Sequence, residues 1–192
     1  MKKSFLISLT LLLSTFFITS VLAGGVYQQP DNFIKQVFNN KPPKPSVLWL
    51  KKDLKQQLSN ILDHNYKGMR IRYWQQTNAA SSKSAWILEE TGKDKLITAG
   101  IVINKGKIEK VKILVFRESR GWEVRHDFFT DQFKQAQLEK DNTLDRHIDN
   151  ISGATLSVRA IKKLAKIALL LDKTIQQKKP AQQGQHNLNN KP

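Results

Sequence analysis

The stretch Asp149-Asn150-Ile151-Ser152-Gly153-Ala154-Thr155 stands directly before the most strongly periodic apolar segment of the chain. In residues 157–171, apolar side chains recur at helical spacing and form a single stripe: Ile161, Leu164, Ala165, Ala168 and Leu171. Arg159, Lys162, Lys163 and Lys166 lie elsewhere on the helix. The sequence therefore predicts a long amphipathic helix that begins near Leu156 and follows a short polar turn.

This polar turn has the features of an anion site. The N–H groups at the start of a helix have no partner within the helix, and they carry partial positive charge. Gly153 allows the backbone to come close to a ligand, and Ser152 and Thr155 offer hydroxyl groups. The same residue types also cap ordinary helices, so a simple helix cap is the alternative interpretation.

The run from Asp149 to Thr155 resembles the D-x-x-[ST]-G-A-[ST] signature of FMN-binding domains. Such domains occur in the C subunit of the sodium-translocating NADH:quinone reductase, in the G subunit of Rnf-type complexes and in small secreted flavoproteins. In that family the last Thr or Ser carries FMN through a phosphoester bond. The resemblance therefore implies covalent FMN on Thr155, with Ser152, Gly153 and Ala154 beside it. Asp149 is expected to position this loop or to be read by the flavin transferase that attaches the cofactor.

A second cluster, Arg117-Glu118-Ser119-Arg120-Gly121-Trp122-Glu123-Val124-Arg125, follows a strand that ends near Phe116. It is similar to an E-S-R-G-x-E-V stretch of the small exported FMN-binding proteins, which is followed there by Phe-x-x-Gln-Phe, here residues 129–133. The resemblance implies that Glu118, Arg120 and Gly121 contact the flavin. The arginines supply positive charge that stabilises a reduced, anionic flavin, and Gly121 lets the backbone approach a flat ring. A solvated loop with internal ion pairs is the alternative.

Two further residues are candidate neighbours of the cofactor or the core. Thr98 lies in Leu96-Ile97-Thr98-Ala99-Gly100, which is also similar to the family, and its hydroxyl is a candidate flavin contact. An ordinary strand threonine is the competing interpretation. Trp86 is expected to be a core residue. We expect no catalytic residue and no metal site, because the histidines show no ligand spacing with carboxylates.

The remaining pattern predicts the fold class. Residues 51–64 have helical periodicity, residues 69–76, 84–88, 97–103 and 108–115 favour strands, and residues 128–138 favour a helix. The last two strands are joined by Asn104-Lys105-Gly106-Lys107, a hairpin signal, and their continuous apolar character indicates central strands. This order predicts a single α+β domain with a mainly antiparallel sheet packed against helices.

The two ends of the chain differ from this domain in composition. Residues 1–23 have the basic start, the uncharged apolar run and the small-residue end of a signal peptide, with a retained membrane anchor as the alternative. Residues 24–46 are rich in Pro, Gln and Asn and predict a flexible linker. The FMN-binding domain is then expected over residues 47–172. Residues 173–192 are nearly devoid of apolar side chains and predict a disordered basic tail.

The formal net charge of +16 is concentrated in these ends, since residues 53–172 carry 21 basic and 15 acidic side chains. Export separates the protein from most nucleic acid, so nucleic-acid binding is not expected. The chain has no cysteine, which excludes disulfides and attached haem.

Together these features predict an exported, periplasmic flavoprotein that transfers electrons. Its expected redox partner is a membrane reductase, a quinone-linked complex or an exported haem protein. The alternative is a basic exported protein that contacts the membrane surface, binding anionic lipid or polysaccharide without a flavin.

Overall fold

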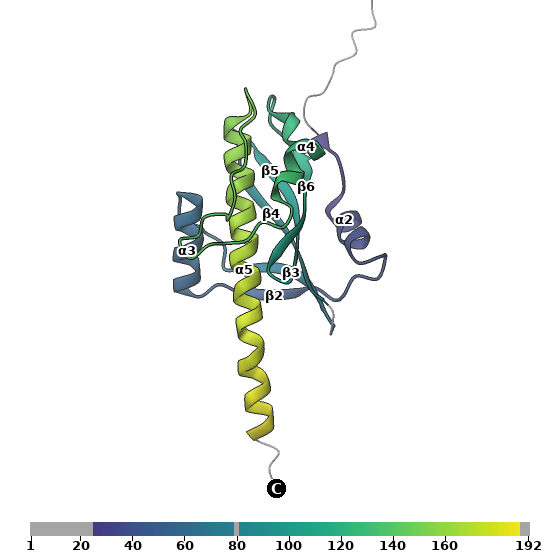
Figure 1. Cartoon of the computed structure of the whole chain (residues 1–192), viewed down its shortest axis with the longest axis vertical. Coiled ribbons are helices and arrows are strands. Elements are labelled where there is room, and N and C mark those ends of the chain that lie inside the picture. Colours follow the sequence, from purple (N-terminus) through teal and green to yellow (C-terminus); the bar gives the residue numbers. More distant parts are fainter. Residues whose placement is uncertain (1–24, 79–80, 189–192) are drawn as a thin grey trace, which may run out of the picture.

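The computed structural model describes residues 25–78 and 81–188, so the predicted signal peptide lies outside the described residues. Its centre is a six-stranded sheet in the order β1-β6-β5-β4-β3-β2, in which every neighbouring pair is antiparallel. The strands are β1 (Gly25–Val26), β2 (Ser46–Trp49), β3 (Arg70–Thr77), β4 (Ser82–Thr91), β5 (Leu96–Asn104) and β6 (Lys107–Phe116). Helices pack against this sheet (Figure 1), which confirms the predicted α+β class.

The β5–β6 hairpin is the central pair, as the apolar runs predicted. Asn104 pairs with Lys107, so the turn between them consists of Lys105 and Gly106. Both turn residues have positive φ, at 52° and 75°, and a two-residue hairpin of this kind requires positive φ at both positions. Residues 97–103 of β5 are all buried because helices cover both faces of the strand.

One face of the sheet carries α5 (Thr155–Leu188), which contacts β4, β5 and β6, with α3 (Lys52–Leu62) beside it (Figure 1). The four apolar residues that predicted α3 are all buried: Leu54, Leu58, Ile61 and Leu62. Trp86 of β4 is fully buried under this layer, as expected of a core residue. None of the helices formed by the described residues combines the length and apolar character needed to cross a membrane.

A buried polar chain fixes α5 to β4. The indole N–H of Trp86 donates to Ser84 Oγ at 2.9 Å, and the Ser84 hydroxyl donates to Asp172 Oδ1 at 2.6 Å. Asp172 is 1% exposed, so its carboxylate depends on such partners. This chain sets the position of α5 along the sheet.

The segment 24–46 is not the flexible linker that its composition predicted. It contains β1 and α2 (Pro30–Val37), and α2 covers the face of the sheet opposite α5. Phe33 and Ile34 are buried there, and Gly100 of β5 leaves room for the Phe33 ring, because an added Cβ would lie 2.5 Å from it. Pro30 stands in the first turn of the helix, where its missing N–H costs nothing. A few apolar side chains among many polar residues were enough to order this segment.

The helix that the sequence predicts over residues 128–138 is longer than the helical segment in the structure. The chain forms a 3-10 turn η1 (Trp122–Arg125), then α4 (Asp127–Thr130) and a second 3-10 turn η2 (Asp131–Phe133). The helix ends there because residue Gln135, with φ of 64°, pairs through its backbone with Ile108 of β6. Phe129, Phe133 and Ala136 are buried, as the pattern predicted.

The tail predicted for 173–192 is helical as far as Leu188, since α5 continues through it. Ile175 is buried, and the side-chain amide of Gln176 donates to Ser82 Oγ at 2.8 Å. The ordered domain therefore extends past residue 172, because two side chains of this polar segment reach the sheet.

The packing of α2 predicts a large effect of removing the Phe33 ring. We expect Phe33→Ala to lower the free energy of unfolding by about 3 to 4 kcal/mol, since a fully buried ring is replaced by a cavity. Phe128 is 61% exposed, and Phe128→Ala should cost under about 1 kcal/mol. Urea unfolding followed by circular dichroism measures both. Equal, small effects would show that the segment is a linker after all.

Candidate functional site

The turn that leads into α5 depends on Gly153. The Ala154 N–H donates to the Ile151 carbonyl at 3.0 Å and closes the turn, in which Gly153 has φ of 78°. An added Cβ at Gly153 would meet nothing within 4 Å. The glycine is therefore needed for its left-handed conformation rather than for space.

The first turn of α5 presents free donors. The first helical hydrogen bond runs from Val158 N–H to the Ala154 carbonyl at 2.9 Å, so the N–H groups of Thr155, Leu156 and Ser157 have no acceptor within the helix. No acidic residue stands in this turn to offset its partial positive charge. Thr155 is exposed. The start of α5 thus combines an accessible hydroxyl with a positive end of a helix dipole.

Gly121 lies against this first turn. Its φ is 83°, and an added Cβ would lie 2.8 Å from Ser157 Oγ and 3.2 Å from Ala154 Cβ. The close backbone approach predicted for Gly121 is thus an approach to α5. A contact between Gly121 and a flavin stays a prediction.

A hollow of about 600 Å³ lies between the strand exit after β6 and the start of α5. We call it the cofactor hollow. Its lining residues are Lys93, Glu118, Ser119, Arg120, Gly153, Ala154, Thr155, Leu156 and Ser157. The structure therefore brings together five predicted site residues, namely Glu118, Arg120, Gly153, Ala154 and Thr155. Lys93, Ser119, Leu156 and Ser157 were not among the predictions.

Glu118 has a clear structural role. Its side chain is buried, and its Oε1 accepts hydrogen bonds from the N–H groups of Lys93 at 2.5 Å, Asp94 at 2.7 Å and Lys95 at 2.9 Å. Burial raises the pKa of this carboxyl, but the three backbone donors and the charge of Lys93 outweigh burial and hold the pKa below its ordinary value. Glu118 thereby fixes the β4–β5 turn and brings Lys93 to the cofactor hollow.

Thr98 lies outside the residues that line the cofactor hollow. It is buried in β5, where its hydroxyl donates to Glu89 Oε1 at 2.6 Å and accepts from Arg117 Nη1 at 3.0 Å. Arg125 stacks over the rings of Tyr27 and Trp122, at 4.6 Å and 5.0 Å from their centroids. Of the three arginines in the predicted cluster, Arg120 is the one that lines the hollow.

Asp149 and Ser152 flank the site without lining the cofactor hollow. The Asp149 backbone N–H donates to the Gln132 side chain at 2.8 Å, which ties the approach to α5 onto the segment after α4. The Asp149 carboxylate is 76% exposed and lies 3.6 Å from His147 Nε2. Both residues are accessible to a partner protein, and their roles stay predictions.

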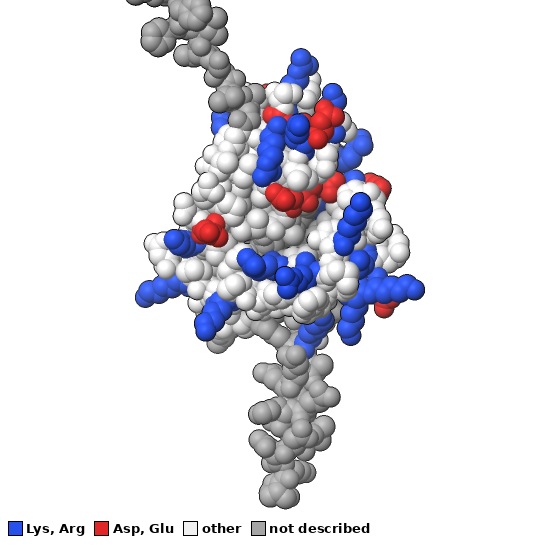
Figure 2. Space-filling model, turned by 180° about the vertical axis from the view of Figure 1, so that it is seen from behind, with Lys and Arg blue, Asp and Glu red and all other residues white. Residues whose placement is uncertain are grey.

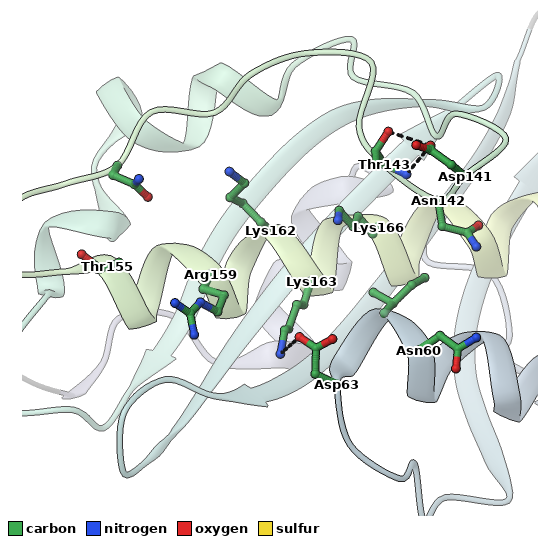
Figure 3. Close-up of a pocket in the computed structure, with 12 residues that line it drawn as sticks. Asn60, Asp63, Asp141, Asn142, Thr143, Thr155, Arg159, Lys162, Lys163 and Lys166 are labelled. Atoms are coloured by element: carbon green, nitrogen blue, oxygen red, sulfur yellow. Dashed lines mark hydrogen bonds and ion pairs between the residues drawn. The ribbon is translucent and has the colours of Figure 1, made fainter.

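Thr155 also borders a second hollow, of about 520 Å³, which we call the basic hollow (Figure 3). Its lining includes four cationic side chains of α5 in a row beyond Thr155: Arg159, Lys162, Lys163 and Lys166. The other lining residues are Asn60, Ile61, Asp63, Asp141, Asn142, Thr143 and Asn150. Thr155 is the residue that both linings share.

The exposed Thr155 and the free N–H groups at the start of α5 form a position suited to a phosphate group. Residues 92–170 match the family model described as FMN-binding domain. This match supports a flavin-binding protein with FMN as its cofactor. No curated protein and no solved structure matches the chain.

The residues of the cofactor hollow fit the phosphate of FMN. Free N–H groups at the start of α5, a first turn without acidic residues and the cations Lys93 and Arg120 all favour a negatively charged phosphate group. The negative charge of Glu118 is partly offset, because its Oε1 accepts hydrogen bonds from three backbone N–H groups of the β4–β5 turn.

The role of Glu118 predicts a pH-dependent loss of stability on substitution. At pH 7, Glu118→Gln should lower the free energy of unfolding by roughly 2 kcal/mol, because hydrogen bonds to a charged acceptor become bonds to a neutral one. The folded-state pKa is lowered, so this stabilisation is present above the unfolded pKa and is lost as pH falls through the folded pKa. The difference from wild type should therefore shrink below about pH 4.

Urea unfolding at a series of pH values measures this difference. Glu123→Gln is the matched control, since Glu123 lies in the same cluster and its side chain has no hydrogen bond to any residue that the structure describes. A constant difference across the pH range would contradict the assigned role of Glu118.

Proposed function

We propose that this protein is exported, carries FMN covalently on Thr155 and transfers electrons between membrane or extracytoplasmic redox partners. The observation that supports this most strongly is the position of Thr155. Its exposed hydroxyl stands at the first residue of α5, beside N–H groups without helical acceptors and at the border of the cofactor hollow. A phosphoester at this atom would place the negative charge of a phosphodiester at the positive end of the helix.

The attachment reaction follows from the family resemblance and balances as a phosphoryl transfer. Thr155 Oγ forms a bond to the phosphorus of the FMN half of FAD, and the bond from that phosphorus to the bridging oxygen breaks. AMP leaves with the bridging oxygen, and the hydroxyl proton passes to a base of the flavin transferase. The divalent metal that assists this step belongs to the transferase.

The chain's own groups then hold and bias the cofactor. The N–H groups of Leu156 and Ser157 and the charge of Lys93 would bind the phosphate. Arg120 is the arginine placed to favour negative charge on the bound group, because it lines the same hollow. The flavin itself supplies the redox chemistry, accepting and donating electrons.

A covalent bond to the cofactor would be an advantage for an exported protein. A freely dissociating FMN lost outside the cytoplasm would not readily be replaced, whereas a phosphoester keeps the cofactor in place. The N-terminal residues 1–23 have the composition of a signal peptide, which supports a periplasmic location. The redox partner would be a membrane reductase, a quinone-linked complex or an exported haem protein.

The attachment site predicts a specific loss of covalent flavin. After co-expression with a flavin transferase, wild-type protein should fluoresce as flavin in a denaturing gel, and Thr155→Ala should not, because the only atom that forms the bond is removed. Thr155→Ser should retain fluorescence, since it keeps the hydroxyl. Thr143→Ala, which removes another hydroxyl that borders the basic hollow, is the matched control and should remain fluorescent.

Two outcomes would contradict the proposal. Wild-type protein without in-gel fluorescence would exclude covalent attachment, and fluorescence in Thr155→Ala would place the bond elsewhere. A colourless protein that binds anionic vesicles at moderate salt would instead favour the alternative of a basic surface-binding protein.

A further inference from the structure

Four cations follow Thr155 along one face of α5. Arg159, Lys162, Lys163 and Lys166 have the i, i+3, i+4 and i+7 spacing that places side chains on one side of a helix. All four line the basic hollow together with Thr155 (Figure 3). Arg159 is one turn from Thr155 and Lys166 is three turns away, so the charged track extends about 16 Å from the modified hydroxyl.

Most of this charge is not neutralised by the protein. Lys163 is engaged, since its Nζ lies 3.0 Å from Asp63 Oδ2 and donates to the Leu62 carbonyl at 2.6 Å. Among the residues that the structure describes, no carboxylate lies within 4 Å of the other three cations: Arg159, Lys162 and Lys166.

The two acidic side chains of the basic hollow, Asp63 and Asp141, have pKa values held below their ordinary range by hydrogen bonds, and nearby cations contribute to both shifts. A hydrogen bond and the charge of Lys163 hold the pKa of Asp63 below its ordinary value, and Lys166 and Arg159 contribute further. Asp141 accepts from the N–H and hydroxyl of Thr143 at 3.0 Å and 2.7 Å, so its carboxylate is largely occupied within its own turn. The hollow is therefore cationic in excess.

Charge alone does not distinguish this surface. Figure 2 shows that Lys and Arg side chains are also scattered over the opposite face of the molecule. The distinguishing property of the basic hollow is that it is continuous with Thr155. A protein that binds there is positioned to reach the Thr155 hydroxyl before the cofactor is attached.

We propose that the basic hollow is the docking surface for the flavin transferase, and that Arg159, Lys162 and Lys166 provide its electrostatic attraction. This inference rests on the proposed function. A transferase that uses a divalent metal would hold it with carboxylates, and it also binds the phosphates of FAD, so we infer that anionic groups surround its site. A cationic track beside the acceptor hydroxyl complements such a mouth. A redox partner, by contrast, needs access to the flavin, which the residues of the cofactor hollow are proposed to hold.

The test uses purified, unflavinylated protein, purified transferase, FAD and the divalent metal. The variant is Arg159→Glu/Lys162→Glu/Lys166→Glu, and initial rates are measured over a range of acceptor concentration and salt. We expect KM for the acceptor to rise and kcat/KM to fall about tenfold or more at low salt, with kcat nearly unchanged. The salt dependence of kcat/KM should also weaken, because fewer charge pairs remain to be screened.

The matched control is Lys105→Glu/Lys107→Glu/Lys110→Glu, with the same charge change in the β5–β6 hairpin. This hairpin lies beside Ser82, which also contacts Gln176 of α5. Gln176 is 21 residues beyond Thr155, or roughly 30 Å along the helix. The control should keep KM within about twofold, as expected of charges far from the contact. Thermal unfolding of both variants, and of the milder triple Gln variant, verifies that they are folded.

The outcomes separate this inference from the proposed function. A wild-type protein that is never flavinylated would contradict the proposed function itself. Normal flavinylation of the triple Glu variant, an equal effect of the control, or a fall in kcat with unchanged KM would each overturn the docking surface while leaving covalent FMN intact. Normal flavinylation combined with slower electron transfer would assign the surface to the redox partner instead.

Discussion

The structure depends most on the fixed position of the first turn of α5. Gly121 lets the strand exit after β6 pack directly on Ala154 and Ser157, where any side chain at 121 would displace the helix. About 25 Å further along the helix, the Asp172–Ser84–Trp86 chain holds α5 on β4. With both regions fixed, Thr155 cannot shift relative to the loop that carries Arg120. A helix start becomes a specific site only when it is held in this way.

The carboxylate of Glu118 fixes the opposite side of the cofactor hollow, which is formed by the β4–β5 turn. Its Oε1 accepts hydrogen bonds from three successive N–H groups and so holds the β4–β5 turn beside the cofactor hollow. The residues Glu118, Ser119, Arg120 and Gly121, which follow β6, thus have different roles. Glu118 and Gly121 shape the site, whereas Arg120 and Ser119 line it. The proposed cofactor contacts are made by groups that this framework positions.

Much of this arrangement was predictable because it is encoded locally. The periodicity of α3 and α5 and the Lys105–Gly106 turn depend on neighbouring residues, and each predicted its element correctly. The run ending at Thr155 predicted the turn before α5, and its role as the attachment site stays a prediction. Lys93 was not predictable, because its place in the hollow results from Glu118, which is 25 positions away in the sequence. The packing of α2 was missed for a similar reason. Its few apolar residues matter only because Gly100, far along the chain, leaves space for Phe33.

The two hollows that meet at Thr155 give the site two directions of approach. One is proposed to hold the cofactor and the other to receive the enzyme that attaches it, so that modification and electron transfer use different surfaces. The central claim is the covalent bond itself, and the most direct test is the intact mass of the protein isolated from its native host, with fragmentation of the Thr155 peptide. The account predicts a chain that begins at Gly24 and carries one FMN, less one water, on Thr155. A mass equal to the unmodified chain would contradict it.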